Sequence, residues 1–511
     1  MSLVASEAAR GLTDKPPAPS RIGYFLTLVG LLAFYVLRYA VSPDRPGNIG
    51  PGWATWSDQA YYLKAVEAWA SGDLSPSGHW YFPGYAMMGA ALRPLFPSQP
   101  FFLIDLFLFA AAIMLFVKIC EAFRVTRMQA LVIFALSTVV PWQLFDQFVI
   151  PWTTTPTMVL ILTVLLAAIR YDHDQGRKWV ILAGACGGAF LLFRPADLVI
   201  LLPVVAFSVT RAWRSGGFRR IVTDASWFTG GFATTAAIAA AAYLAIYGPQ
   251  ESEYMLIARR EGFDFLRLPL KWVVLVLDPH PLFPSGEALL AAYPWLLVGM
   301  IGAVQFSLIK RSFPHTLLAA TVLAYLTLYL CYVGLLPSGL WRFNLIHYFK
   351  WIFAPLGLFA FLALRSLGDR SNWRSFALAA AILVVPLCLH VRLAELPATS
   401  TFTDSERGVL LVFTEPARLD AIDIPLDSGN DSTLYFAPHS LTLDETALRP
   451  ISDFHAFKTQ SGSRLIFMHD VSAREAAVEL APGNRIARHP DPKAFAAALG
   501  VGAPCWLVSC Q

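Results

Sequence analysis

The sequence predicts a mostly α-helical, polytopic membrane protein of about eleven transmembrane helices, followed by a small mixed α/β domain. Only 14% of its 511 residues are charged, against roughly 25% in soluble globular proteins. Several apolar runs are long enough to cross roughly 30 Å of hydrocarbon, and this pattern stops near Arg392. The net charge of +4 is small and the basic residues are spread out, so we expect no nucleic-acid partner.

The first apolar run follows a polar, Pro-rich stretch. Residues 1–20 lack the charged, apolar and small-residue regions of a cleaved signal peptide. We expect them to form a disordered cytoplasmic tail before a transmembrane module at 21–392. The expected spans lie at about 21–41, 99–117, 128–140, 153–169, 179–193, 196–210, 225–247, 290–309, 316–335, 345–364 and 375–392.

Lys and Arg gather in alternate loops between these runs. Because cytoplasmic loops carry the excess of Lys and Arg, the alternation predicts a cytoplasmic N-terminus. After eleven spans, the C-terminal domain is then outside. The basic residues of the alternate loops are Lys118, Arg124, Arg127, Arg170, Arg177, Lys178, Arg211, Arg214, Arg219, Arg220, Lys310, Arg311, Arg365, Arg370 and Arg374.

Residues 393–511 are predicted to form a soluble, extracytoplasmic mixed α/β domain. "GVLLVF", "STLYFA" and "RLIFM" are strand-like runs bounded by turn residues. "SAREAAVEL" predicts a helix with Ser472 and Glu475 in a capping box, and "PKAFAAALG" predicts a second helix that ends at Gly500. Cys505 and Cys510 can pair in an oxidising compartment or remain free thiols.

The first outer loop, about 42–98, begins its polar part with "WSDQAYYLKAVEAWASGDL". Ser57 can cap a helix that carries Asp58 in its first turn and ends at Gly72. One apolar face with helical spacing indicates an interfacial helix, and "HWYFPGYAMMGAALRPLF" predicts a second one. Asp58 is either a charge that suits a helix N-terminus or a functional acid. The apolar face consists of Tyr62, Ala65, Val66 and Trp69.

This arrangement resembles the C-type (GT-C) superfamily of membrane glycosyltransferases. That superfamily includes the protein O-mannosyltransferases and the bacterial enzymes that put aminoarabinose or galacturonate on lipid A. The matching features are a short tail, one span, a long outer loop with Asp58 before an interfacial helix, and the aromatic-Pro-Gly turn in "HWYFPGY". The resemblance covers the architecture of the whole transmembrane module.

The resemblance implies that the chain transfers a sugar, with inversion, from a polyprenyl-phosphate donor to an extracytoplasmic lipid, glycan or protein. It also implies a bacterial inner membrane and Asp58 as the essential acidic residue. One departure concerns the Glu-Lys that precedes the Pro pair in the lipid A transferases, because Tyr81 and Phe82 stand there. Another cation must then bind the phosphate. Residues expected to line the donor and acceptor cavity are Tyr61, His79, Tyr81 and Tyr85.

Such a transfer needs a base for the acceptor hydroxyl and fixed cations for the departing phosphate. We expect Asp58 to be the base, because desolvation beneath an interfacial helix would raise its basicity. Asp146, in "PWQLFDQFVIPW", is a second acidic candidate. It would orient the acceptor sugar or share a metal with Asp58. The alternative for Asp146 is a solvated loop residue among interfacial aromatics.

Candidate phosphate ligands lie near the outer ends of three runs. The start of the tenth run carries Arg342, His347 and Lys350. Because an ionisable residue inside a span is usually functional, we expect these residues to bind the phosphate. Lys350 can instead snorkel to the interface. Arg194, in "FRPAD", is a further candidate, or it forms a structural ion pair with Asp197.

The loop after the seventh run is long enough to form a lid. Arg259 and Arg260 in it would clamp the phosphate or the acceptor, or lie on a solvated helix face. His79, Glu67 and His280 match no metal-ligand spacing. We therefore expect no certain cofactor, and a divalent metal stays an open alternative.

Two other functions stay open at this point. The chain could be a transporter or flippase for a lipid-linked sugar, or a polymerase or ligase that joins lipid-linked oligosaccharides. Transporters tend to have repeated halves and polar residues near the bilayer midplane. Here no repeat is visible and the unusual polar residues gather at span ends, which favours an enzyme. A polymerase would share this topology and differ in its donor, an oligosaccharide on a diphosphate lipid.

Overall fold

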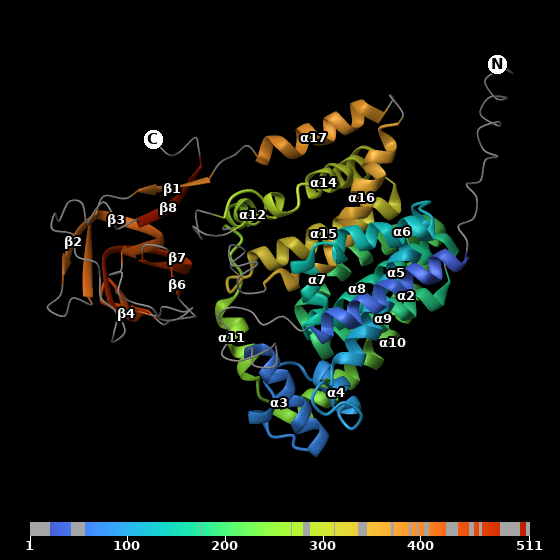
Figure 1. Ribbon diagram of the computed structural model, residues 1–511, viewed down its shortest axis with the longest axis horizontal. Coiled ribbons are helices and arrows are strands. Elements are labelled where there is room, and N and C mark those ends of the chain that lie inside the picture. Colours follow the sequence, from blue (N-terminus) through green and yellow to red (C-terminus); the bar gives the residue numbers. More distant parts are fainter. Residues whose placement is uncertain are drawn as a thin grey trace.

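The computed structural model contains a helical part and a C-terminal β-sheet, each with its own hydrophobic core (Figure 1). The sheet and the helical part occupy different ends of the molecule in this view. The structure describes residues 21–41, 57–174, 176–266, 268–279, 287–310, 312–335, 345–368, 372–387, 391–395, 398–402, 408–425, 438–448, 454–458, 462–480 and 501–506.

Among the described residues, five helices are long and apolar enough to cross a membrane, or six if a bent pair counts as one span. The chain is a multi-pass membrane protein. Every predicted apolar run contains helix, but the count of eleven spans is not confirmed and stays a prediction. The helices within these runs are α2 (Arg21–Ala40), α5 (Phe102–Ala122), α6 (Arg127–Phe134), α8 (Thr154–Asp174), α9 (Arg177–Phe193), α10 (Leu201–Tyr247), α14 (Trp295–Val304), α15 (Phe313–Cys331), α16 (Phe353–Ser366) and α17 (Trp373–Leu387).

Two predicted boundaries differ in the structure. The chain does break between the sixth and seventh runs, but the helices on both sides extend into the predicted basic loop, and the non-helical break in α10 is confined to Gly216 and Gly217. Gly217 has a φ of 62°, which suits glycine. The run expected to be helical from 345 begins as two 3₁₀ turns, η7 (Leu345–Tyr348) and η8 (Lys350–Ile352). Residues three apart eclipse each other in 3₁₀ geometry, so His347 and Lys350 can both face α8.

The predicted third span bends sharply. A capping box of Thr126 and Gln129 starts α6, which continues through the π-helical turn η3 (Ala135–Val139). The chain then turns by 93° into α7 (Trp142–Val149). Pro141 lies at the bend and lacks the backbone N–H that a continuous helix needs. The segment that carries Asp146, for which a solvated loop was one alternative, is therefore a short helix.

Glycines bring α9 and α10 into close backbone contact. A Cβ at Gly184 would meet the carbonyl group of Phe228, and one at Gly231 would meet the carbonyl oxygen of Ile181. Small residues of this kind let membrane helices approach closely. The contact fixes the end of α9, where Arg194 follows, relative to η4 (Pro195–Ile200) and α10.

The first outer loop contains the two predicted helices, α3 (Ser57–Ser71) and α4 (Pro83–Leu92). Gly72 follows α3 with a φ of 74°, as its predicted role as a helix stop requires. Figure 1 shows α3 and α4 at the end of the bundle where α11 (Glu253–Glu261) also lies. We call this the α3 end. The opposite end, which carries the break in α10, is called the arginine end.

The predicted lid segment is partly helical. It contains α11, α12 (Leu268–Val276) and α13 (Leu289–Ala292). Ser252 caps α11 by accepting a hydrogen bond from the Met255 N–H at 3.3 Å. These helices return the chain from α10 to α14 across the α3 end.

The C-terminal sheet has eight antiparallel strands in the order β1-β8-β3-β7-β4-β5, with β2 on β3 and β6 on β7. Two long strands, β3 and β7, pair along their length with register shifts. The strands are β1 (Val391–Glu395), β2 (Ala398–Phe402), β3 (Gly408–Pro425), β4 (Pro438–Leu443), β5 (Thr446–Leu448), β6 (Phe454–Lys458), β7 (Gly462–Leu480) and β8 (Val501–Trp506).

The predicted helix "SAREAAVEL" was wrong, because this segment is part of β7. Ala476 and Val478 face the core of the sheet and pair with β3 on one side and β4 on the other. Tertiary pairing therefore outweighs the local helix propensity. The strand predicted at "STLYFA", the helix predicted to end at Gly500, and the side chains of Cys505 and Cys510 lie outside the described residues.

Adjacent glycines in α10 test the close packing of α9 and α10. Gly231→Ala should lower the thermal unfolding midpoint of the purified protein, because overpacking costs about 1–3 kcal/mol. Gly230→Ala is the matched control, since a Cβ at Gly230 meets open space and helix propensity favours Ala by up to about 1 kcal/mol. Equal midpoints for the two variants would contradict the packing.

Candidate active site

Asp58 stands in the first turn of α3 and is held by a tyrosine from the segment between α3 and α4. The Tyr81 hydroxyl donates to Asp58 Oδ1 at 2.6 Å. Burial raises the pKa of Asp58 above its usual value, while the Tyr81 hydroxyl and the charge of Arg194 act in the opposite direction. Asp58 is thus a desolvated carboxylate within electrostatic range of a guanidinium.

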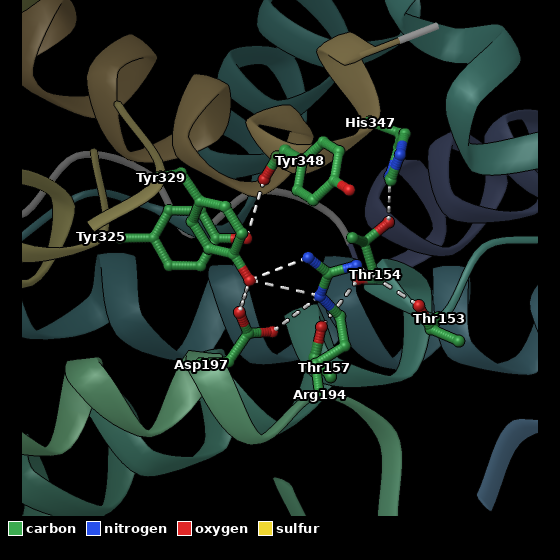
Figure 2. A network of polar contacts seen from close by, with 9 residues as sticks. All are labelled: Thr153, Thr154, Thr157, Arg194, Asp197, Tyr325, Tyr329, His347 and Tyr348. Carbon is green, nitrogen blue, oxygen red and sulfur yellow. Dashed lines mark hydrogen bonds and ion pairs between the residues drawn. The ribbon is translucent and has the colours of Figure 1, made fainter. Parts of the chain in front are cut away.

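Arg194 follows α9, and its side chain is only 11% exposed. Nε and Nη2 donate to the Tyr329 hydroxyl at 3.3 and 2.8 Å, and Nη1 donates to Thr153 Oγ1 at 3.4 Å. Nε also lies 3.6 Å from Asp197 Oδ2. Figure 2 shows these groups converging on the guanidinium from the start of α8, from η4 and from α15.

Two tyrosine rings complete the enclosure of Arg194. The centroids of Tyr329 and Tyr348 lie 5.3 and 4.6 Å from the guanidinium carbon, within cation–π range. The Tyr329 hydroxyl also donates to Asp197. The ion pair with Asp197, one of the two readings of the sequence, is therefore present, and it belongs to a larger network around the cation.

A run of threonines at the start of α8 contacts the basic residues of this region. Thr153 accepts from Arg194, Thr154 Oγ1 lies 3.2 Å from His347 Nδ1, and Thr155 Oγ1 accepts from Lys350 at 2.7 Å. Sequence reasoning did not identify these residues. The available signal was "WTTTPT", an unusual cluster of hydroxyl groups where an apolar run begins.

His347 and Lys350 lie inside the protein beside that run. The ring of His347 stacks on Trp152 with centroids 3.8 Å apart (Figure 2 shows His347 above Thr154). Lys350 is 1% exposed and also donates to the Gln147 carbonyl at 2.8 Å. Lys350 therefore ends in the protein interior and does not snorkel. Arg194 is close enough to both residues to interact electrostatically.

Asp146 lies in α7, where it is buried and not in a solvated loop. Arg38 of α2 donates from Nε to Asp146 Oδ1 at 2.6 Å, and the Arg38 guanidinium also lies over the Trp142 ring. The structure therefore directs this carboxylate toward the first span, where it ties α2 to α7.

The other predicted cavity residues divide between the surface and the core. Tyr61 is 37% exposed and stacks on Trp80. The His79 ring contacts the Asp73 carbonyl, and its own carbonyl accepts from Tyr247. Tyr85 is fully buried and donates to both carboxylate oxygens of Asp105, at 3.0 and 2.8 Å. Of the four residues, Tyr81 is the one that contacts Asp58.

Helix α11 brings Tyr254 to the Asp58 site and carries Glu261 within electrostatic range of Tyr254. The Tyr254 ring lies edge-on to Tyr81, with centroids 5.1 Å apart, and Glu261 accepts a hydrogen bond from Tyr332. Asp58 and Glu261 both act electrostatically on Tyr254. Sequence reasoning missed these two residues. The signal was the capped segment "SEYMLIARRE", whose aromatic and acidic residues were read only as part of a lid.

Among the remaining predicted ligands, Arg259 is the one whose side chain the structure describes, and it lies apart from this cluster. Arg259 is exposed and pairs with Glu251 at 2.8 Å, as the solvated-face alternative requires. The side chain of Arg260, and all of Arg342 and His280, lie outside the described residues. Within the described part of the chain, no group of three or more His, Cys, Asp and Glu is placed to hold a metal ion.

Comparison with known proteins gives structural neighbours only. No family model matches the sequence, and no curated protein matches it. ArnT from Cupriavidus metallidurans bound to undecaprenyl phosphate is 18% identical, over 72% of this chain and 64% of its own, with a TM-score of 0.44. The apo state of the same protein is also 18% identical, over 71% of this chain and 63% of its own, with a TM-score of 0.43. An Archaeoglobus fulgidus oligosaccharyltransferase in complex with Zn and sulfate is 16% identical, over 71% of this chain and 51% of its own, with a TM-score of 0.38.

The chain thus spans less than two thirds of the length of these solved structures.

The Arg38–Asp146 pair can be tested by a double-mutant cycle on stability. Removing one partner of a buried pair costs up to about 3–5 kcal/mol, and we expect less here because Arg38 is 24% exposed. Asp146→Asn and Arg38→Met should each lower the thermal unfolding midpoint of the purified protein. The double variant should lose less than the sum of the two. Additive losses would show that the two side chains do not interact.

Proposed function

We propose that this membrane protein is an inverting glycosyltransferase of GT-C type that uses a polyprenyl-phosphate sugar donor. One observation carries the proposal: a partly buried carboxylate, Asp58, accepts a hydrogen bond from Tyr81 and lies within electrostatic range of an enclosed cation, Arg194. A base and an anion-binding group at the same end of a helical bundle are the two functions that this transfer requires.

Asp58 acts as the general base. Its carboxylate takes the proton of the acceptor hydroxyl while the acceptor oxygen forms a bond to the anomeric carbon of the sugar. The bond from that carbon to the phosphate oxygen breaks on the opposite face, and its electron pair leaves with the phosphate. Tyr81 holds one oxygen of Asp58, so the other oxygen is available to the acceptor.

Arg194 binds the phosphate of the donor. Its charge is held in place by Asp197, Tyr329 and Thr153, so it does not have to reorganise as negative charge develops on the leaving group. The start of α8 adds the partial positive charge of a helix N-terminus. Lys350 and His347 support this region from within the protein.

The proposal extends to the setting of the site. The α3 end faces the outside of a bacterial inner membrane, the module at 21–392 carries the chemistry, and the domain at 393–511 lies on the same outer side. The acceptor is a lipid, a glycan or a protein. The alternation of basic loops along the sequence supports this orientation.

Substitution of Asp58 tests the proposal directly. Asp58→Asn should lower the transfer rate by about 100- to 10,000-fold, the usual loss for a general base, with donor affinity largely unchanged. Asp73→Asn is the matched control, because Asp73 is exposed in the same outer segment and its side chain accepts a local hydrogen bond from the Ser75 N–H. Near-normal turnover of purified, folded Asp58→Asn would rule out Asp58 as the base.

The pH dependence of transfer tests the environment of Asp58. The base works only when ionised, so the rate falls as pH drops through the pKa of Asp58. Burial raises that pKa, and the acid limb of kcat/KM should therefore lie above the range of an ordinary aspartate, about 3.9.

The hydrogen bond from Tyr81 lowers the pKa of Asp58, so Tyr81→Phe should shift the acid limb to higher pH. Tyr61→Phe removes a neighbouring phenol and should leave the position of the limb unchanged, whatever its effect on the rate. A shift to lower pH in Tyr81→Phe would contradict the assignment.

A further inference from the structure

A second feature lies at the arginine end, away from the Asp58 site. Helices α8, α9 and α10 enclose a cavity of about 200 Å³. Its walls are mostly apolar and come from both sides of the break in α10. An apolar cavity of about 150 Å³ is large enough to bind benzene, so this one can hold a stretch of alkyl chain. Wall residues include Ala168, Ala183, Val204, Val209, Ile221 and Phe228.

The cavity reaches the protein surface and has one polar wall. Val205 and Val209 in its lining are 41% and 40% exposed. Asp224 also lines it and is only 8% exposed. Asp224 Oδ2 accepts from Arg220 at 2.8 Å and from Tyr171.

The second oxygen, Asp224 Oδ1, is buried and accepts no hydrogen bond from any residue that the structure describes. A buried acceptor left without a donor is costly. The site is therefore suited to a ligand that brings a hydroxyl donor beside an alkyl chain.

Basic side chains are exposed on two of the helices that line this cavity. Arg214 and Arg219 are exposed on the two sides of the Gly216–Gly217 break, and Lys178 is exposed at the start of α9. The neighbouring Asp172 is already paired with Arg211 at 3.0 Å. The exposed basic side chains thus favour a ligand with an anionic headgroup.

We propose that this cavity binds one molecule of an anionic glycerophospholipid, phosphatidylglycerol. One acyl chain fills the apolar cavity, the phosphate contacts Arg214 and Arg219, and a headgroup hydroxyl donates to Asp224 Oδ1. Because the walls come from both halves of α10, the lipid joins these halves to α8 and α9. This site is independent of the proposed sugar transfer.

Lipid binding to the full-length protein tests the proposal, measured by native mass spectrometry in detergent at increasing lipid concentration. One phosphatidylglycerol should bind at least tenfold more tightly than phosphatidylcholine. Ser208→Phe, which fills the cavity from its wall, should abolish this preference. Thr210→Phe is the matched control, because Thr210 is exposed two residues away on the same helix and should retain it.

Substitution of two exposed arginines tests the proposal even if Ser208→Phe does not fold. Arg214→Gln with Arg219→Gln should reduce the affinity for phosphatidylglycerol at least fivefold and leave phosphatidylcholine binding unchanged. The proposal is overturned if wild type binds the two lipids equally or if the charge variant keeps full preference. It is also overturned if a polyprenyl phosphate, and not phosphatidylglycerol, is the lipid that Ser208→Phe excludes.

Discussion

The burial of one positive charge, that of Arg194, is the constraint on which the α3 end depends. A charge removed from water costs several kcal/mol even after relaxation, so it needs acceptors and aromatic faces on all sides. Thr153 and Tyr329, which stand 41 and 135 positions away in the sequence, provide part of this enclosure, with Asp197 and Tyr348. The start of α8, the end of α9, η4 and α15 must therefore meet at one point (Figure 2).

The same enclosure determines what Asp58 can do. Low local polarity favours the protonated form of a carboxyl and strengthens the interaction of a fixed cation with an anion. A base with raised pKa and a held guanidinium therefore arise from one physical cause, the exclusion of water by α3, α11 and the tyrosines between them. Glu261 and Tyr254, at the two ends of α11, extend this environment, so movement of that helix would change the polarity around Asp58.

The apolar runs were enough to predict the helical class and the approximate positions of most apolar helices, but not α12. The first outer loop was enough to predict the α3 helix, which begins at Ser57 and stops before Gly72. The partners of the ionisable residues could not be predicted, because they depend on contacts between distant segments. From the sequence, Asp146 is indistinguishable from an acidic residue of a solvated loop, whereas in the structure α7 places it against Arg38. The threonines at the start of α8 contact Arg194, His347 and Lys350, which are distant in the sequence. The helix predicted for "SAREAAVEL" was wrong for the same reason, because pairing with the two neighbouring strands, β3 and β4, makes this segment a strand.

The central claim is that Arg194 is the phosphate-binding cation of a site in which Asp58 is the base. A structure of the full-length protein with a polyprenyl phosphate bound tests it most directly. The account predicts a phosphate oxygen within hydrogen-bond distance of the Arg194 guanidinium, with the Asp58 carboxylate facing the same cavity. A phosphate bound at Arg259, or at any position where it contacts neither Arg194 nor the residues that enclose it, would contradict the account.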